Sequence, residues 1–196
     1  MSPASAALIV VASYLLGSLS PAYHLGRALK GVDLRRVGSG NLGARNAAHE
    51  LGTAAGVAVW AADAAKGAAA VLISRAVGAP PWGAAAAGAA AVAGHIWPPA
   101  FGFRGGRGVS TALGASLAIV PVETLIGFAV WAVVSRLSGS LYAGGIAGFP
   151  VATASAFLLG RGGVTALAPL IVAVPTALRH IPALVRRVRA RDLRLP

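Results

Sequence analysis

Long runs of Ala, Val, Leu, Ile and Gly alternate with short polar segments along the 196 residues. A straight helix needs roughly 20 apolar residues to cross a bilayer, and several of these runs are shorter. The pattern therefore predicts an all-α integral membrane protein, a compact bundle of about seven transmembrane helices, some short, tilted or broken. Pro121 is expected to separate the fourth helix from the fifth. The apolar runs cover about residues 5–26, 52–74, 83–101, 109–121, 123–136, 139–160 and 162–178.

Composition supports a membrane location. Hydrophobic residues make up 57% of the chain and charged residues 11%, and the mean hydropathy is +0.74, which leaves too little polar surface to cover a soluble globule. The net charge of +12 would fit nucleic acid, but polytopic membrane proteins also carry a basic excess on one side, so we expect no nucleic-acid partner. Nothing in the composition suggests a second domain, and residues 1–196 are expected to form one transmembrane domain.

The distribution of Lys and Arg predicts the orientation. Seven spans with the N-terminus outside place the loops at 27–51, 102–108 and around 137 on the same side as the C-terminal tail, whereas the opposite side receives only Arg75 and Arg161. The positive-inside rule then assigns the basic loops to the cytoplasm. Merging the short runs into a hairpin or one long helix would give five spans, and this alternative keeps both loops on the same side.

Two polar segments are rich in glycine and arginine. In the first, the glycines free backbone N–H groups to face inward, while the side chains add donors, so the segment is either an anion site or an ordinary Gly/Asn turn. In the second, arginines and glycines precede the start of a helix, where unpaired N–H groups and the helix dipole favour an anion. The candidate residues are Gly38, Ser39, Gly40, Asn41, Gly43, Arg45 and Asn46 in the first segment, and Arg104, Gly105, Gly106, Arg107 and Gly108 in the second.

Charged and titratable residues add three further candidates. Asp63 and Lys66 lie three apart in an apolar run, where isolated charges are costly, so they form either a structural ion pair or a substrate contact. The chain has no Cys and its four His residues are dispersed, which excludes thiolate chemistry and makes a metal site improbable, so no metal or cofactor is expected. His180 and, second to it, His95 are candidate bases, since imidazoles titrate near neutral pH.

Three motifs together resemble the bacterial membrane glycerol-3-phosphate acyltransferases that use acyl phosphate, the PlsY family. The motifs are Asp33-Leu-Arg35 followed by Gly38-Ser-Gly-Asn-Leu-Gly-Ala-Arg-Asn46, Asp63-x-x-Lys66-Gly67, and Gly94-His95-x-x-Pro98 followed by Phe103-Arg-Gly-Gly-Arg-Gly-Val-Ser-Thr111. The resemblance implies a multi-pass protein of the bacterial inner membrane. It also implies transfer of a fatty acyl group from acyl phosphate to the 1-hydroxyl of glycerol 3-phosphate, which yields lysophosphatidate for phospholipid synthesis without a metal.

The chain departs from the family pattern at several positions. Arg replaces the usual Lys at positions 104 and 107. Arg45 stands where the family usually has Thr, and His49 stands where it has Arg; because the two positions share a helix face, Arg45 can deliver its guanidinium to nearly the same place. The last family signature is half retained, with Arg179, His180 and Arg186 present, Ala183 in place of Asn, and no Gly-x-Glu.

These residues give a working mechanism. The second segment, with Arg104, Arg107 and the Gly105 to Gly108 amides, holds glycerol 3-phosphate. The first, with Ser39, Asn41 and Arg45, holds the acyl-phosphate head or the developing oxyanion, although the assignment of the two phosphates could be reversed. The acyl chain lies between helices. Two alternatives remain open: a non-catalytic or altered-acceptor homologue that binds lipid or phosphate, and a small transporter. The sequence does not predict the oligomeric state.

Overall fold

The computed structural model describes the backbone of residues 1–192, with side chains through residue 180 apart from residue 142. All regular elements in this described part are helices. They are α1 (Pro3–Ser18), α2 (Pro21–Lys30), α3 (Ala44–Leu51), α4 (Thr53–Ala76), α5 (Pro81–Ile96), the short 3₁₀ helix η1 (Pro99–Phe101), α6 (Val109–Ile119), α7 (Pro121–Ser138), α8 (Leu141–Leu158) and α9 (Gly163–Asp192).

The predicted all-α membrane fold is confirmed. Each apolar run is helical over most of its length, and the break at Pro121 separates α6 from α7. Within the described part of the chain, four segments are long and apolar enough to cross a membrane: Pro3–Lys30, Thr53–Ala76, Pro121–Ser138 and Gly163–His180. Two boundaries differ from expectation. The first run divides into α1 and α2, because the side chain of Ser20 accepts a hydrogen bond from the Tyr23 amide and caps a new helix. The third run ends at Ile96, before Pro98 and Pro99.

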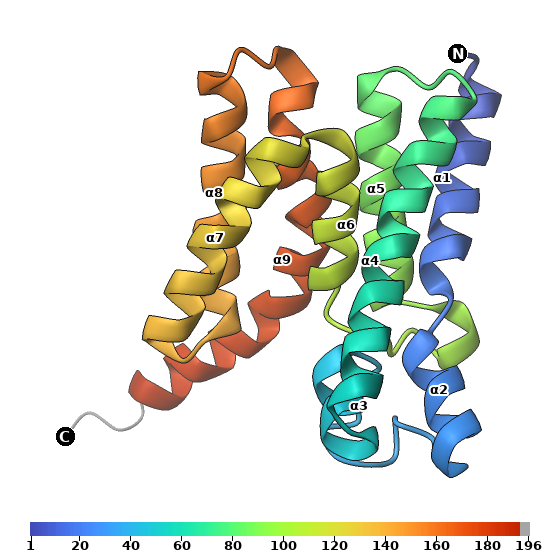
Figure 1. Ribbon diagram of the computed structural model, residues 1–196, viewed down its shortest axis with the longest axis vertical. Helices are drawn as coiled ribbons and strands as arrows, with labels where there is room; N and C mark the ends of the chain where they lie inside the picture. The colour runs from blue at the N-terminus through green and yellow to red at the C-terminus, as the bar shows by residue number, and fades with distance from the viewer. Residues whose placement is uncertain (193–196) are drawn as a thin grey trace.

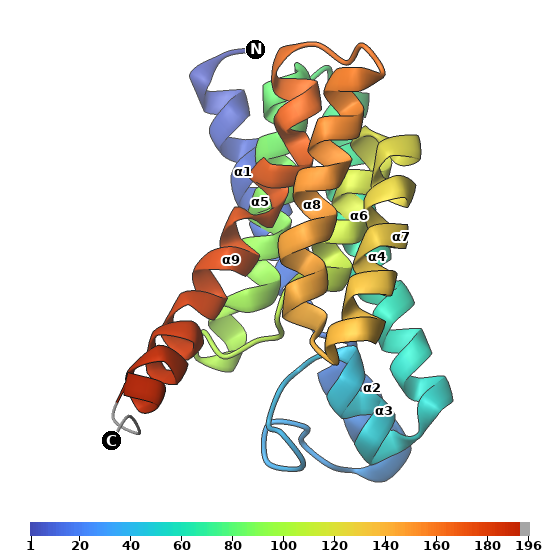
Figure 2. The same cartoon turned by 90° about the vertical axis from the view of Figure 1, so that its left-hand side faces the viewer.

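The helices form a bundle whose polar connections gather at one end (Figures 1 and 2). In Figure 1 the N-terminus lies at the upper end, while α2, α3 and the described end of α9 lie at the lower end. The pairs α1 and α5, α4 and α6, α5 and α9, and α7 and α8 pack against each other. The hairpin of α7 and α8 therefore lies on the side of the bundle opposite α1, with α5, α6 and α9 between them.

Small residues allow α4 and α6 to approach closely. A Cβ atom at Gly114 of α6 would lie 1.9 Å from the Ala64 carbonyl oxygen of α4, and one at Gly67 would lie 2.1 Å from the Thr111 carbonyl oxygen. Without a hydrophobic driving force between helices in lipid, such close backbone contact supplies much of the packing energy. The close approach also sets the distance between Asp63 and the start of α6, which both belong to the site described below.

Two arginines at the upper end bond to polar groups of α6 and α7. Helix α6 has 11 residues, about 16 Å of rise, and so crosses only about half of a 30 Å hydrocarbon core. Arg75 donates to the carbonyl oxygen of Ala118 at 2.7 Å, at the end of α6. Arg161 donates to Glu123 Oε1 at 2.7 Å, and Glu123 is fully buried. Arg75 and Arg161, which lie at the end opposite the basic loops, thus have structural partners.

Replacing Gly114 with Ala tests the close contact of α4 and α6. We expect Gly114→Ala to lower the free energy of unfolding by about 1–3 kcal/mol, because the added methyl group overlaps a backbone carbonyl. Gly145→Ala is the matched control, since a Cβ at Gly145 of α8 meets nothing within 4 Å, and its effect should stay within about 0.5 kcal/mol. Unfolding in detergent measures both. Equal stabilities of the two variants would contradict the packing.

Candidate active site

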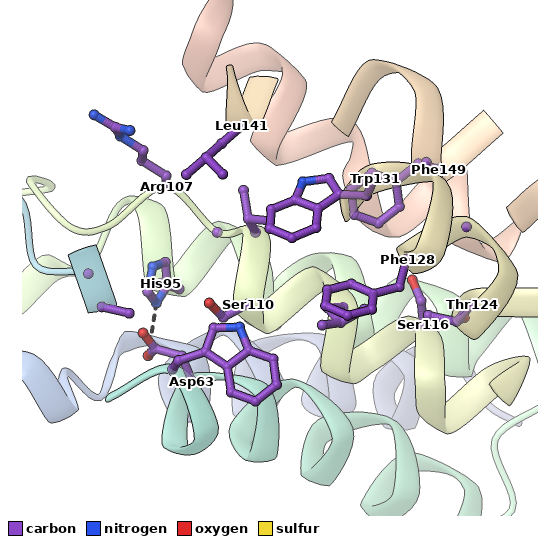
Figure 3. A pocket seen from close by; sticks show the side chains of 18 of the residues that line it. Asp63, His95, Arg107, Ser110, Ser116, Thr124, Phe128, Trp131, Leu141 and Phe149 are labelled. Atoms are coloured by element: carbon purple, nitrogen blue, oxygen red, sulfur yellow. Dashed lines mark ion pairs between the residues drawn. The ribbon is translucent and has the colours of Figure 1, made fainter. Parts of the chain in front are cut away.

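The two glycine-rich segments meet at one cavity of about 270 Å³. Its polar end is formed by the first segment, the end of α5 and the start of α6, and its other end extends between α6 and the α7–α8 hairpin. Figure 3 shows Arg107, His95 and Asp63 on one side and the aromatic rings of Phe128, Trp131 and Phe149 on the other. The remaining lining residues are Asn41, Gly43, Ala44, Arg45, Trp60, Gly108, Val109, Ser110, Leu113, Ser116, Thr124, Gly127, Leu141, Gly148 and Ala152.

Asn46 holds the first segment in shape. Its side-chain amide donates to the carbonyl oxygens of Leu34 at 3.0 Å and Val37 at 3.2 Å, and its Oδ1 accepts from the Ser39 amide at 2.9 Å. Asn46 is 4% exposed, so its amide is engaged with the loop backbone. Neither Asn46 nor the exposed Ser39 is among the described residues that line the cavity.

Helix α3 directs Arg45 to the cavity and His49 away from it. Arg45 follows directly on Ala44, the first residue of the helix, and it lines the polar end. His49 lies one turn later and its side chain is 79% exposed, with Nδ1 at 2.6 Å from Glu50 Oε1. Arg45 therefore lines the cavity, whereas His49 does not.

The second segment closes over the end of α5. The amides of Gly105 and Gly106 donate to the carbonyl oxygens of Ile96 at 3.0 Å and His95 at 3.1 Å. A Cβ at Gly106 would lie 2.0 Å from His95 Nε2, so only glycine lets the loop approach the imidazole. Gly108 then adopts φ 83°, a left-handed conformation, as the residue before α6. The first turn of α6, with Ser110, consequently faces the cavity beside Arg107.

A buried carboxylate joins α4 and α5 at the polar end. Asp63 Oδ1 lies 2.9 Å from Lys66 Nζ and 3.2 Å from His95 Nδ1 (dashed in Figure 3). Lys66 also donates to the Leu19 carbonyl oxygen at 2.7 Å, in the break between α1 and α2. The structure therefore contains the ion pair that was one alternative for Lys66. The carboxylate also orients the imidazole, because a His with Nδ1 held by a carboxylate presents Nε2 in a defined direction.

The other end of the cavity is apolar. Phe128 and Trp131 of α7 stack with ring centroids 5.2 Å apart and planes at 12°, and Phe149 of α8 lies beside them (Figure 3). Helices α7 and α8 cross closely here, since a Cβ at Gly127 would lie 2.4 Å from the Gly148 carbonyl oxygen. An arm lined by aromatic rings and small residues suits an alkyl chain, and it opens directly from the cationic end.

Arg35 connects the first segment to the beginning of the second. Its guanidinium lies over the rings of Tyr23 in α2, at 5.5 Å, and Phe101 in η1, at 5.4 Å. It also donates to both carboxylate oxygens of Asp33, with Nη2 at 2.7 Å from Oδ2. These hydrogen bonds hold the pKa of Asp33 down at about 2. The ion pair thus holds Arg35 in place within its own loop, and the cation–π contacts join that loop to α2 and to η1, which precedes the second segment.

The structure sorts the candidate residues into two groups. Six of them line the cavity: Asn41, Gly43, Arg45, His95, Arg107 and Gly108. The others lie outside that lining, namely Gly38, Ser39, Gly40, Asn46, Lys66, Arg104, Gly105, Gly106 and His180. His180 is half-buried in α9, close enough to Arg107 for their charges to interact. The side chains of Ala183 and Arg186 lie outside the described residues.

Sequence reasoning missed two parts of the site. It placed His95 second to His180 and did not pair it with Asp63, which reaches it across the α4–α5 contact. It also did not anticipate the aromatic arm, whose residues lie in apolar runs and carry no signal of their own. The rings of Phe128 and Trp131 are three positions apart, a spacing that could have indicated a shared helix face.

Comparison with known proteins decides the family. The family model for glycerol-3-phosphate acyltransferase matches residues 7–190. The chain belongs to this family. The resemblance drawn from the motifs is thereby confirmed.

Individual relatives agree with this assignment. Glycerol-3-phosphate acyltransferase of Rubrobacter xylanophilus is 47% identical over 131 residues, which cover 67% of this chain and 65% of the relative. Glycerol-3-phosphate acyltransferase 2 of Moorella thermoacetica is 43% identical over 149 residues, 74% of this chain and 76% of the relative. The match thus spans slightly less than two thirds of the Rubrobacter protein, and it spans 51% of glycerol-3-phosphate acyltransferase 5 of Dehalococcoides mccartyi.

Solved structures extend the likeness to almost the whole chain. The crystal structure of PlsY, an integral membrane glycerol 3-phosphate acyltransferase, in its glycerol 3-phosphate form is 34% identical, with a TM-score of 0.80, and covers 95% of this chain and 94% of its own. The lysophosphatidic acid form of PlsY is 33% identical, also with a TM-score of 0.80. This family member therefore shares the integral membrane fold of PlsY.

The pKa of Asp33 predicts how the ion pair between Asp33 and Arg35 responds to acid. Because this pKa falls from 3.8 to about 2 on folding, the ionised carboxylate stabilises the fold above pH 3.8, and that stabilisation disappears as the pH falls toward 2. Asp33→Asn should therefore unfold at a lower temperature than the natural chain at pH 6, and the difference should shrink between about pH 4 and pH 2. A difference that stays constant over this range would contradict the Asp33–Arg35 assignment.

Proposed function

We propose that the protein transfers an acyl group from acyl phosphate to the 1-hydroxyl of glycerol 3-phosphate, giving lysophosphatidate and inorganic phosphate. One observation carries this proposal: a single cavity joins a cationic end, with Arg45 and Arg107, to an apolar arm between α6, α7 and α8. An acyl phosphate has the same two parts, and glycerol 3-phosphate adds a second anion. The names of the relatives and of the PlsY structures support the same reaction.

The cationic end binds the phosphate groups. Arg45 and Arg107 enter from opposite segments, and the first turn of α6 adds unpaired N–H groups, a helix dipole and the hydroxyl of Ser110. Asn41 contributes a neutral donor beside Arg45. We assign glycerol 3-phosphate to the second segment and the acyl-phosphate head to the first. Ser39 and Asn46 then act through the shape of the first segment, and Arg104 acts outside the cavity.

His95 accepts the proton in the transfer step. The hydroxyl oxygen of glycerol 3-phosphate attacks the acyl carbon, its proton passes to His95 Nε2, and the bond from the acyl carbon to the phosphate oxygen breaks, with phosphate taking the electron pair. Asp63 stabilises the imidazolium that forms, since its carboxylate already lies at His95 Nδ1. Phosphate leaves readily because the arginines neutralise its charge, so positioning and electrostatics supply the remaining catalysis.

The proposed location is the bacterial inner membrane, with the N-terminus outside and both segments in the cytoplasm. The lower end of the bundle in Figure 1 carries the glycine-rich segments and most of the basic residues. Arg75 and Arg161, the exceptions, are engaged with Ala118 and Glu123. Acyl phosphate, which is embedded in lipid, and water-soluble glycerol 3-phosphate can then meet at the membrane surface.

The direct test combines purified protein in lipid discs with acyl phosphate and glycerol 3-phosphate, and follows lysophosphatidate and phosphate. We expect both products in equal amounts. Arg45→Ala should lower kcat/KM about 10- to 100-fold, because a charge-assisted contact to phosphate is lost. His49→Ala, one helical turn away and directed to solvent, is the control and should change kcat/KM less than about twofold. Binding of glycerol 3-phosphate without phosphate release would instead indicate a non-catalytic binder.

The two histidines make a second test. His95→Gln should lower kcat about 10²- to 10⁴-fold, as expected for loss of a general base, with a smaller change in KM. His180→Gln should have the weaker effect, because His180 does not line the cavity. Single-turnover measurements of acyl transfer separate chemistry from binding. A larger loss of kcat in His180→Gln than in His95→Gln would move the base to α9.

A further inference from the structure

The tip of the second segment holds an aromatic residue in a costly conformation. Phe103 has φ 59°. Among the described residues, it is the one residue other than glycine with a positive φ. The left-handed region is unfavourable for a bulky side chain, so the surrounding turn must hold it there. The turn does so with hydrogen bonds from the amides of Phe101 and Phe103 to the Pro98 carbonyl oxygen, at 3.1 and 3.0 Å.

The strained turn directs the ring outward rather than into the protein. Phe103 is 59% exposed, and the neighbouring Pro99, Ala100, Gly102 and Arg104 are exposed as well. Because the ring stays exposed, burial in the protein core does not offset the free-energy cost of this backbone strain. Such strain is typical of segments whose contacts lie with another molecule.

The depth of this tip matches the edge of the hydrocarbon core. Phe101 contacts Tyr23, with ring centroids 4.9 Å apart. The 16 residues of α1 give about 24 Å of helical rise, and the break at Leu19 and Ser20 and the first turn of α2 follow before Tyr23. The hydrocarbon core is about 30 Å thick. If Pro3 marks one boundary, the Tyr23–Phe101 contact marks the other. Aromatic rings and arginines are favoured at this level.

We propose that Phe103 and Arg104 anchor the second segment in the membrane interface, with the Phe103 ring between lipid chains and the Arg104 guanidinium at anionic lipid phosphates. The composition of the tip fits a lipid surface, because it combines an exposed ring and small apolar residues with one cation and no acidic group. The anchor fixes the height of Gly105 to Arg107, and hence of the cavity mouth, relative to the lipid headgroups. The anchoring itself does not depend on the proposed acyl transfer.

The chain has no cysteine, so single cysteines can report depth. Phe103→Cys and Ala100→Cys are labelled with a fluorophore in discs that contain phosphatidylglycerol, and quenching by lipid-attached nitroxides is compared with quenching by aqueous iodide. Arg36→Cys, an exposed position two residues before the first segment, is the matched control. We expect labels at 103 and 100 to be quenched by the lipid nitroxides and shielded from iodide, and the label at 36 to show the reverse order.

Either of two other quenching results would overturn the proposal. Equal access of iodide to labels at 103, 100 and 36 would place the tip in water and indicate a soluble partner. A label at 100 shielded in lipid beside a water-accessible label at 103 would keep the loop at the interface but remove Phe103 as its anchor. Because the measurement reads depth and not turnover, a failed anchor leaves the proposed acyl transfer untouched, and loss of activity leaves the anchor testable.

Discussion

The arrangement of the helices around the polar end of the cavity depends on the burial of one carboxylate. Asp63 is 1% exposed, and a charge so deep in an apolar bundle requires partners of opposite sign or hydrogen-bond donors. Lys66 and His95 provide them, and Lys66 extends the network to the Leu19 carbonyl oxygen, where α1 gives way to α2. A single buried group therefore fixes α4 against α5 and against the first helical break. In doing so it sets the direction of the imidazole that faces the cavity.

The bilayer explains why irregular backbone gathers around this network. Unpaired backbone groups are tolerated at membrane depth only where protein or a polar cavity covers them. The start of the short helix α6 opens into the cavity, and its end is covered by Arg75. The half-spanning helix thus places a positive dipole end beside Arg45 and Arg107, while its small residues bring it against α4. A cationic end and an apolar arm then meet in one space.

Much of this architecture can be predicted from the sequence, because apolar runs and prolines act locally. The helix break at Pro121 and the two glycine-rich segments follow from such local rules. The contact of Asp63 with His95 could not be predicted, since it joins residues 32 positions apart, and small residues on every side of α4 and α5 give no preferred face. The first apolar run divides at Ser20 because of a single helix cap. The mean hydropathy of the whole run does not reveal that cap. Arg45 is intermediate: its helix-face relation to His49 indicated the site, but only the fold shows that it reaches the cavity.

The central claim is that the two glycine-rich segments act on one site, and a double-mutant cycle tests it most directly. The cycle uses Arg45→Ala, Arg107→Ala and the double variant, with kcat/KM for acyl phosphate measured for each in lipid discs. If both guanidinium groups act within the same cavity, their losses should be non-additive, with a coupling energy of about 0.5–3 kcal/mol. Losses that add to within about 0.3 kcal/mol would mean that the two arginines act independently, and would contradict the shared site.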